Sequence, residues 1–283
     1  MPPRTTPTAR QLRLGVELRK LREHAGLTAT DAAALLGTER TKISNIETGR
    51  FGVSAARVRR LASHYDCSDT NLIEALADMT GERKRQWWEV YREILPAALL
   101  DLAELEHHAS ALRSAQFMHL PGLLQTHDHA RVVFQQVVPS LPPPEVEHRV
   151  SHRVKRQAVL FRESPPAYTA VIHEAALRMR FGGRSTTRTQ LQHILNMSEH
   201  DHISVLVVPF AAGAIPGSGQ SVLYAAGPIP QLDTVQLDSE HGSVFLDADA
   251  QLARYRIFMD RTEKAALKED ESRDFIRAIA QDL

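Results

Sequence analysis

The first 80 positions contain five short segments in which apolar residues recur with helical spacing. Leu14, Leu18 and Leu21 lie at i, i+4 and i+7, which is the spacing of one helix face. Glycines end several of these segments, and hydroxyl side chains that can cap a helix precede three of them. The predicted helices contain residues 14–25, 29–36, 39–47, 55–65 and 69–80, with Thr28, Thr38 and Ser54 as caps of the second, third and fourth. We therefore expect an all-α N-terminal domain.

Beyond residue 80, helical segments are mixed with short runs rich in β-branched residues. Helices are predicted at 83–95, 99–110, 145–161, 191–197, 249–264 and 271–281, and strands at 168–173, 203–209, 221–225, 234–237 and 244–246. The predicted organisation is a flexible tail at 1–9, a five-helix domain at 10–80, a linker helix at 81–98 and a larger domain at 99–283. The fold class is therefore multidomain, all-α followed by α+β.

Charge is distributed unevenly between these parts. The chain carries 34 Lys and Arg against 34 Asp and Glu, yet its first 60 residues hold 12 basic and 5 acidic side chains, a net charge of +7. Such asymmetry is typical of a nucleic-acid-binding domain joined to a domain of another role, although solvated basic helices give the same excess. The single cysteine, Cys67, excludes an intramolecular disulfide and any zinc site with two thiolates, which favours a cytoplasmic protein. No apolar run reaches the roughly 20 residues of a membrane span.

Residues 27–49 carry the pattern with the clearest functional meaning. A helix-turn-helix needs small residues in its first helix, a glycine in the turn, and a second helix that buries apolar residues and exposes polar ones to the major groove. Ala32, Ala33, Gly37, Ile43 and Ile46 meet the packing demands. The exposed polar face would consist of Glu39, Arg40, Thr41, Lys42, Ser44 and Asn45. A five-helix bundle without DNA binding is the structural alternative.

The run KISNIETG at 42–49, with LRKLREHAGLT at 18–28, resembles the XRE family of phage-repressor-like helix-turn-helix proteins. The resemblance implies a structural ion pair between Arg22 and Glu47 and a recognition helix at 39–47. Where the family usually has glutamine at the start of the second helix, this chain has Ala29, which indicates different backbone contacts.

The same resemblance assigns DNA contacts to individual positions. Base-reading positions are Arg40, Thr41 and Asn45, where arginine favours guanine and asparagine favours adenine. DNA-backbone positions are Thr28, Lys42, Ser44 and Arg50, which would fix register without reading sequence.

The C-terminal part also resembles a known family. The supporting residues are Trp87-Trp88, HLPGLLQTHDHAR at 119–131, Arg-x-x-Arg-Gln at 153–157 and VVPFAAGAIPG at 207–217. Together they are similar to the antitoxin-like C-terminal domain common in actinobacterial XRE regulators. The resemblance implies an effector and assembly domain, and members of that group commonly lie beside genes for small partner proteins.

Enzyme and metal-binding motifs are missing from this part of the sequence. The segment 217–221 lacks the spacing of a nucleophile elbow, no G-x-x-x-x-G-K-[ST] loop occurs, and His173-Glu174 lacks the second histidine of a zinc-binding helix. We therefore expect no enzyme activity, no metal and no cofactor. The aromatic residues Trp87, Trp88 and Tyr91, with the loop 209–219, form either an effector pocket or part of the core.

These patterns predict a sequence-specific transcriptional regulator of double-stranded DNA. One helix-turn-helix covers little surface, so a homodimer is expected. The apolar stripe Phe275, Ile276, Ile279 and Leu283 is either its interface or part of the core. A small-molecule effector or partner protein would regulate it through the C-terminal domain. The alternatives are an antitoxin-like protein that holds a small partner and autoregulates its own operon, and an enzyme tethered to DNA.

Overall fold

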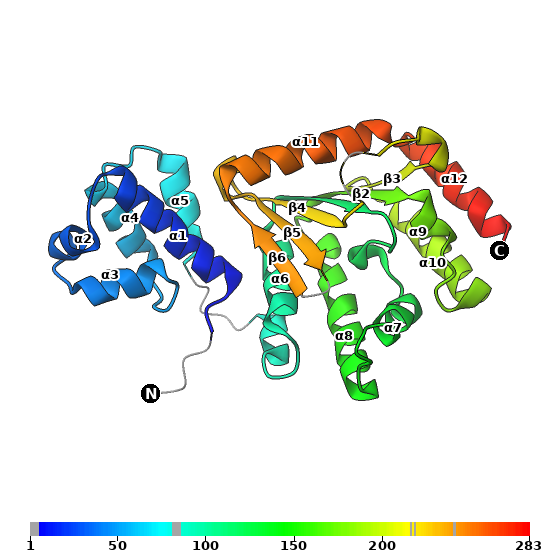
Figure 1. Cartoon of the computed structure of the whole chain (residues 1–283), viewed down its shortest axis with the longest axis horizontal. Coiled ribbons are helices and arrows are strands. Elements are labelled where there is room, and N and C mark those ends of the chain that lie inside the picture. Colours follow the sequence, from blue (N-terminus) through cyan, green and yellow to red (C-terminus); the bar gives the residue numbers. More distant parts are fainter. Residues whose placement is uncertain (1–5, 81–85, 216, 218, 240–241) are drawn as a thin grey trace. The chain divides into compact units, whose positions relative to one another are not determined.

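The computed structural model, drawn in Figure 1, describes residues 6–80, 86–215, 217, 219–239 and 242–283. The chain divides into two compact units, residues 1–89 and 90–283. Of the tail predicted at 1–9, residues 1–5 lie outside the described residues. Thr8 and Ala9 already form the cap and first residue of a helix, so the tail is shorter than predicted.

The described residues of the N-terminal unit form the five predicted helices. They are α1 (Ala9–His24), α2 (Ala29–Leu36), α3 (Arg40–Glu47), α4 (Ala55–His64) and α5 (Thr70–Asp78). Thr28 and Ser54 cap α2 and α4 as predicted, and Thr28 forms a reciprocal capping box with Asp31. The prediction that Thr38 caps α3 is wrong, because the turn after Gly37 extends one residue further and Glu39 occupies that position.

Apolar side chains from four helices meet in the core of this unit. Leu18 on α1, Ile43 on α3, Val58 on α4 and Leu76 on α5 are all buried. Each such burial contributes about 1.5–3 kcal/mol. Because α3 has only eight residues, these tertiary contacts, rather than its own helix propensity, hold it in place.

The prediction of a linker helix at 81–98 is wrong for residues 86–98, which form no continuous helix. Residues 81–85 lie outside the described part of the chain, Trp87–Tyr91 form a short 3-10 helix, and turns follow before α6 (Ala97–His108) begins. Pro96 explains the break, because proline disfavours a helical conformation of the residue before it. It occupies the N-cap of α6 instead.

In the described part of the C-terminal unit, six strands form a mixed sheet. They are β1 (Ala111–Gln116), β2 (Ala167–His173), β3 (Ile203–Val208), β4 (Val222–Ala226), β5 (Thr234–Ser239) and β6 (Gly242–Leu246), in the order β3-β2-β1-β4-β5-β6. Strands β1, β2 and β3 are parallel, whereas β4, β5 and β6 each run antiparallel to the strand before them in the sheet. Parallel neighbours need long crossovers, and helices provide them here.

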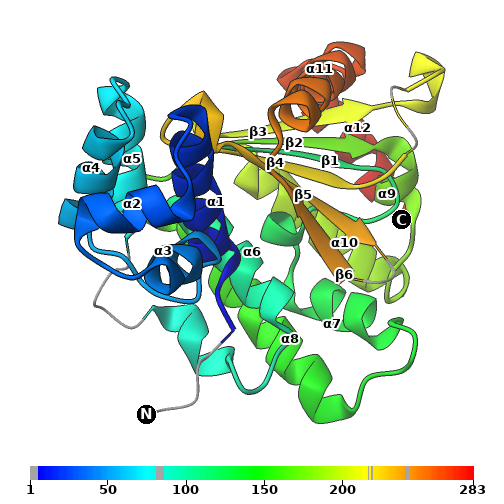
Figure 2. The same ribbon diagram turned by 60° about the vertical axis from the view of Figure 1, so that its left-hand side comes forward.

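Helices cover both faces of this sheet (Figures 1 and 2). The helices after α6 are α7 (His127–Gln135), α8 (Pro143–Arg156), α9 (Glu174–Arg178), α10 (Gly183–Met197), α11 (Asp249–Ala265) and α12 (Glu269–Gln281). On one face, Leu252 and Met259 of α11 pack in one cluster with Val235 of β5. On the other face, α10 and α12 share a larger cluster with β2 and β3, and α6 and α8 lie on this side too.

The apolar stripe of α12 belongs to this larger cluster. Ile276 and Ile279 are buried, and Phe275 and Leu283 pack against the same core. The stripe therefore contributes to the core of the C-terminal unit, which is one of its two predicted uses, and a dimer interface at its partly buried members stays a prediction.

A buried histidine on α7 makes the stability of this unit sensitive to pH. His129 is 1% exposed, and neither ring nitrogen has a hydrogen-bond partner among the described residues. Its ring packs against Phe181 with 5.4 Å between centroids. Burial, with smaller effects of His119 and Arg153, lowers the pKa of His129 to about 4. The folded protein therefore keeps this ring neutral at pH values where the unfolded chain protonates it.

We expect His129 to lower the free energy of unfolding by about 2–3 kcal/mol as the pH falls from about 6.5 to about 4. The stability is fully present above the unfolded pKa and is lost as the unfolded chain takes up the proton. Urea denaturation across this range should show a smaller loss for His129→Leu than for the unsubstituted protein. His127→Leu, at an exposed position of the same helix, is the control, and equal losses in all three proteins would contradict the prediction.

Candidate nucleic-acid interface

An ion pair fixes the C-terminal end of α3 to α1. Arg22 donates from Nε to Glu47 Oε1 at 2.6 Å and from Nη2 to Glu47 Oε2 at 2.9 Å, which is the bidentate geometry of a strong pair. Both side chains are less than 10% exposed. The hydrogen bonds that Arg22 donates to Glu47 raise the pKa of Arg22. Arg22 Nη1 also donates to the Leu27 carbonyl at 2.7 Å, so one guanidinium ties α1, the turn before α2 and the end of α3 together.

Two glycines allow the backbones of α1 and α3 to approach closely. A Cβ atom on Gly15 would lie 2.5 Å from the Glu47 carbonyl oxygen, which no side chain tolerates. Gly49 follows α3 with φ of 68°, and a Cβ there would lie 3.1 Å from the backbone of Gln11. The ion pair and this close packing together set the direction of α3.

The outer face of α3 carries the predicted base-reading residues. Arg40 and Thr41 are exposed and Asn45 is half-buried, whereas Ile43 and Ile46 are buried against the rest of the unit. The polar and apolar residues therefore lie on opposite faces of one short helix, with Arg40 at its N-terminus. This is the arrangement by which a recognition helix presents side chains to base edges.

The predicted DNA-backbone residues lie around the same helix. Ser44 and Arg50 are exposed and Lys42 is half-buried. Thr28 is exposed too, but its hydroxyl donates to Asp31 Oδ2 at 2.6 Å and accepts from the backbone N–H of Asp31. Its capping role therefore accounts for its side chain, and a phosphate contact there stays a prediction.

The predicted effector-pocket aromatics are largely buried. Trp87 and Trp88 pack edge to face with 5.6 Å between ring centroids, and Trp88 is 2% exposed. Tyr91 belongs to the C-terminal unit, where its hydroxyl lies 2.9 Å from Ser151 Oγ. A pocket at these residues stays a prediction.

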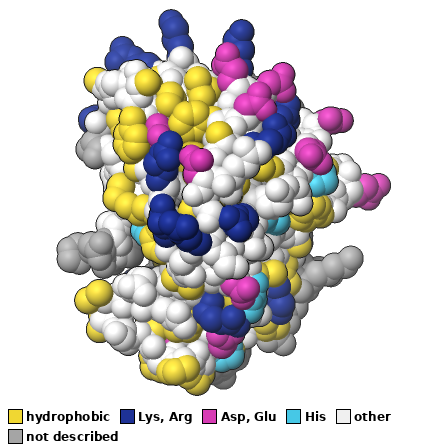
Figure 3. All heavy atoms as spheres, turned by 90° about the vertical axis from the view of Figure 1, so that its right-hand side faces the viewer, with side chains coloured by type: hydrophobic (Ala, Val, Ile, Leu, Met, Phe, Trp, Pro, Cys, Tyr) yellow, Lys and Arg dark blue, Asp and Glu magenta, His cyan; other side chains and the backbone are white. Residues whose placement is uncertain are grey.

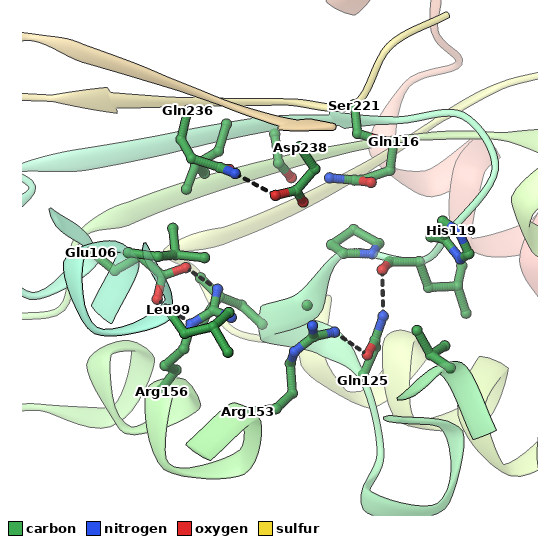
Figure 4. Close-up of a pocket in the computed structure, with 18 of the residues that line it drawn as sticks. Leu99, Glu106, Gln116, His119, Gln125, Arg153, Arg156, Ser221, Gln236 and Asp238 are labelled. Carbon is green, nitrogen blue, oxygen red and sulfur yellow. Dashed lines mark hydrogen bonds and ion pairs between the residues drawn. The ribbon is translucent and has the colours of Figure 1, made fainter. Parts of the chain in front are cut away.

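A cavity of about 200 Å³ lies inside the C-terminal unit, between the sheet and the helices α6 and α8 (Figure 4). Its polar lining residues include Glu106, Ser114, Gln116, His119, Gln125, Arg153, Arg156, Ser221, Gln236 and Asp238. None of the residues known to line it is Trp87, Trp88 or Tyr91. Sequence reasoning missed this site.

Two sequence motifs noted above contribute residues to this cavity, although the sequence did not show that they lie together. The run at 119–131 and the Arg-x-x-Arg-Gln run at 153–157 contact each other here: Arg153 Nη1 donates to Gln125 Oε1 at 2.6 Å, and Gln157 Nε2 donates to the Gln125 carbonyl at 2.6 Å. The other signal is polarity within strands. Gln236 is 4% exposed although it alternates with apolar residues along β5, so its polar side chain lies in the interior rather than in solvent.

Comparison with known families gives results for both units. A family described as a domain of unknown function, DUF5753, matches residues 99–278, which is more than half of the chain. The chain belongs to the DUF5753 family. In this DUF5753 protein a helix-turn-helix domain family also matches residues 13–76, which include α2 and α3. That match supports DNA as the partner and transcriptional regulation as the role. No curated protein and no solved structure matches the chain.

Two other kinds of feature, a metal site and a membrane-spanning helix, concern the DUF5753 chain as well. Among the residues that the structure describes, no group of three His, Cys, Asp or Glu side chains is placed to hold a metal ion. No helix in the same residues is long and apolar enough to cross a membrane. On the face of the C-terminal unit shown in Figure 3, basic and acidic side chains are interspersed. A surface that binds the phosphate backbone of DNA typically carries a continuous basic patch instead.

The buried ion pair gives a direct test of how α3 is held. Glu47→Ala leaves the Arg22 guanidinium buried without its carboxylate, so we expect a loss of about 3–5 kcal/mol in the stability of the N-terminal unit. Glu74→Ala is the matched control, because Glu74 pairs with Arg59 but both are about half exposed, and such pairs contribute only about 0–1 kcal/mol. Thermal melting should separate the two variants, and equal shifts would contradict a structural role for the Arg22–Glu47 pair.

Proposed function

We propose that this protein is a sequence-specific transcriptional regulator of the XRE type that reads the DNA major groove with α3. One observation supports this proposal above the others: Arg40, Thr41 and Asn45 lie on the face of α3 opposite the buried Ile43 and Ile46. The helix-turn-helix family match and the net charge of +7 in the first 60 residues agree with it.

Each residue of the proposed interface has a distinct role. Arg40 has the geometry to donate two hydrogen bonds to guanine O6 and N7, and Asn45 to pair with adenine, while Thr41 contacts a base edge. Lys42, Ser44, Arg50 and Thr28 contact phosphates. These contacts place the helix without distinguishing sequences.

The remaining parts of the proposal concern assembly and control. A single α3 buries too little surface for tight specific binding, so the regulator acts as a homodimer on two half-sites. The C-terminal unit controls it through a ligand or a small partner protein, as in the antitoxin-like domain it resembles. We assign it to the cytoplasm and give it no enzymatic role, because its sequence carries none of the catalytic motifs considered above.

Arg40→Ala tests the base-reading role. A preferred site is first selected from genomic fragments with the unsubstituted protein. We then expect the variant to lose about 1–3 kcal/mol of binding free energy on that site, and little on random DNA of the same length and salt. Fluorescence anisotropy titration measures both affinities.

Arg50→Ala is the matched control, an exposed arginine assigned to the backbone. It should weaken binding to selected and random DNA alike. It should also reduce the slope of the logarithm of the binding constant against the logarithm of the salt concentration by about one. If Arg40→Ala behaves in the same way as Arg50→Ala, Arg40 does not read a base. If no fragment is enriched in the selection, the regulator proposal itself is wrong.

A further inference from the structure

The cavity of the C-terminal unit contains a cation that lacks an anionic partner. Arg153 extends from α8 into it, and its Nη1 donates to the neutral amide of Gln125 (Figure 4). Its Nε is buried and has no hydrogen-bond partner among the described residues. No carboxylate of these residues lies within ion-pair distance of Arg153. The side chain as a whole is half-buried, and its guanidinium carbon lies 4.6 Å from the centroid of the Phe134 ring. A guanidinium withdrawn from water is usually paired with a carboxylate, since burial of an unpaired charge is costly.

The neighbouring arginine shows what a satisfied site looks like in the same cavity. Arg156, one helical turn further along α8, donates from Nε and Nη2 to the two carboxylate oxygens of Glu106, the former at 2.7 Å. Both side chains are almost fully buried. Both carboxylate oxygens of Glu106 therefore accept from Arg156, and Glu106 forms no ion pair with Arg153. Burial and the repulsion of Arg156 lower the pKa of Arg153 to about 9, so the group still carries its charge at neutral pH.

An acidic side chain lies across the cavity from Arg153. Asp238 projects from β5 on the opposite wall in Figure 4. Its Oδ1 accepts from Gln236 Nε2 at 2.5 Å and from Ser243 Oγ at 3.0 Å. These neutral donors orient the carboxylate without cancelling its charge. The cavity thus has a positive pole on the helix side and a negative pole on the sheet side, without direct contact between the two.

The rest of the lining defines the size and polarity of a matching molecule. Gln116 and Ser221 line the cavity beside Asp238 on the sheet side (Figure 4), and Leu99, Leu102, Leu120 and Leu223 supply apolar surface. A volume of about 200 Å³ is below the roughly 300–1,000 Å³ of pockets for drug-sized ligands. This is room for a small molecule and not for a nucleotide or a peptide chain.

We propose that this cavity binds a free α-amino acid, with its carboxylate on Arg153 and its ammonium group on Asp238. Arginine suits the first contact because its planar fork matches a carboxylate. The inference goes beyond the proposed regulator, because binding of the amino acid is measured without DNA. If both proposals hold, the amino acid is the effector that the C-terminal unit senses.

The test uses the full-length protein and the common protein amino acids as probes. Each is added separately at millimolar concentration in a thermal-shift screen, and any that raises the melting temperature is titrated by isothermal calorimetry. Its carboxamide and its N-acetyl derivative are titrated in parallel, since each removes one charged group. We expect at least one amino acid to bind and both derivatives to bind at least about tenfold more weakly.

Variants connect the binding to the two poles. Arg153→Gln and Asp238→Asn should each weaken binding about 10- to 100-fold, because each removes a charge-assisted contact. Arg149→Gln is the matched control: Arg149 lies one turn earlier on α8, where it pairs with Glu145, and its substitution should leave affinity unchanged. Asp238 is exposed, so Asp238→Asn decides the question if Arg153→Gln fails to fold.

Three results would overturn the proposal. One is that no amino acid binds in the screen or in calorimetry. Another is that the carboxamide or the N-acetyl derivative binds as tightly as the free amino acid. Such a result would mean that Arg153 does not recognise the carboxylate, or that Asp238 does not recognise the ammonium group. The third is an unchanged affinity of Asp238→Asn. None of these results bears on DNA binding by α3, so the two proposals fail independently.

Discussion

The buried pair between Arg22 and Glu47 is the interaction on which the N-terminal unit depends. It joins α1 to the last residue of α3, and the same guanidinium holds the turn before α2 through the Leu27 carbonyl. A helix of eight residues has little stability of its own. Its orientation therefore comes from this pair, from the close approach at Gly15 and from the two buried isoleucines. These constraints leave the opposite face of α3 free to carry polar side chains that the fold does not need.

In the C-terminal unit, the main structural constraint is the burial of polar groups beside an apolar core. Its sheet buries apolar residues against α11 on one face, and on the other it combines an apolar cluster with a polar cavity. Buried polar groups reduce stability unless they are satisfied. Glu106 and Arg156 satisfy each other, whereas Arg153 donates only to the neutral amide of Gln125. The energetic cost of a half-buried cation without a carboxylate partner is the physical reason to treat this cavity as a ligand site and not as a packing defect.

Sequence reasoning reached the elements whose residues interact locally and missed those decided by tertiary contacts. The helices around Leu18, Ile43 and Val58 follow from their apolar spacing, and the capping box at Thr28 and Asp31 follows from a spacing of three. Strand β1, with the sequence Ala-Leu-Arg-Ser-Ala-Gln, was not predicted because it has one large apolar residue and owes its conformation to its two neighbouring strands. Helix α7 was also missed, although Ala130, Val133 and Phe134 have the i, i+3, i+4 spacing of a helix face, because the segment is short and begins with the polar run His-Asp-His.

The candidate sites divide in the same way. Positions on α3 could be assigned because a helix-turn-helix fixes them within one contiguous segment. The cavity could not, since Glu106, Arg153 and Asp238 come from three elements that only the fold brings together. The predicted linker helix failed for a local reason: Pro96 disfavours a helical conformation of the residue before it, so that only the short 3-10 helix Trp87–Tyr91 forms before α6.

The central claim is that α3 lies in the major groove, and methylation interference on a selected DNA site measures this most directly. Dimethyl sulfate modifies guanine N7, which faces the major groove, and adenine N3, which faces the minor groove. If α3 lies in the major groove, methylation of individual guanines prevents binding by the unsubstituted protein. At one of these guanines, methylation no longer prevents binding when Arg40 is replaced by alanine. Interference confined to adenine N3, or an identical guanine pattern for both proteins, would contradict it.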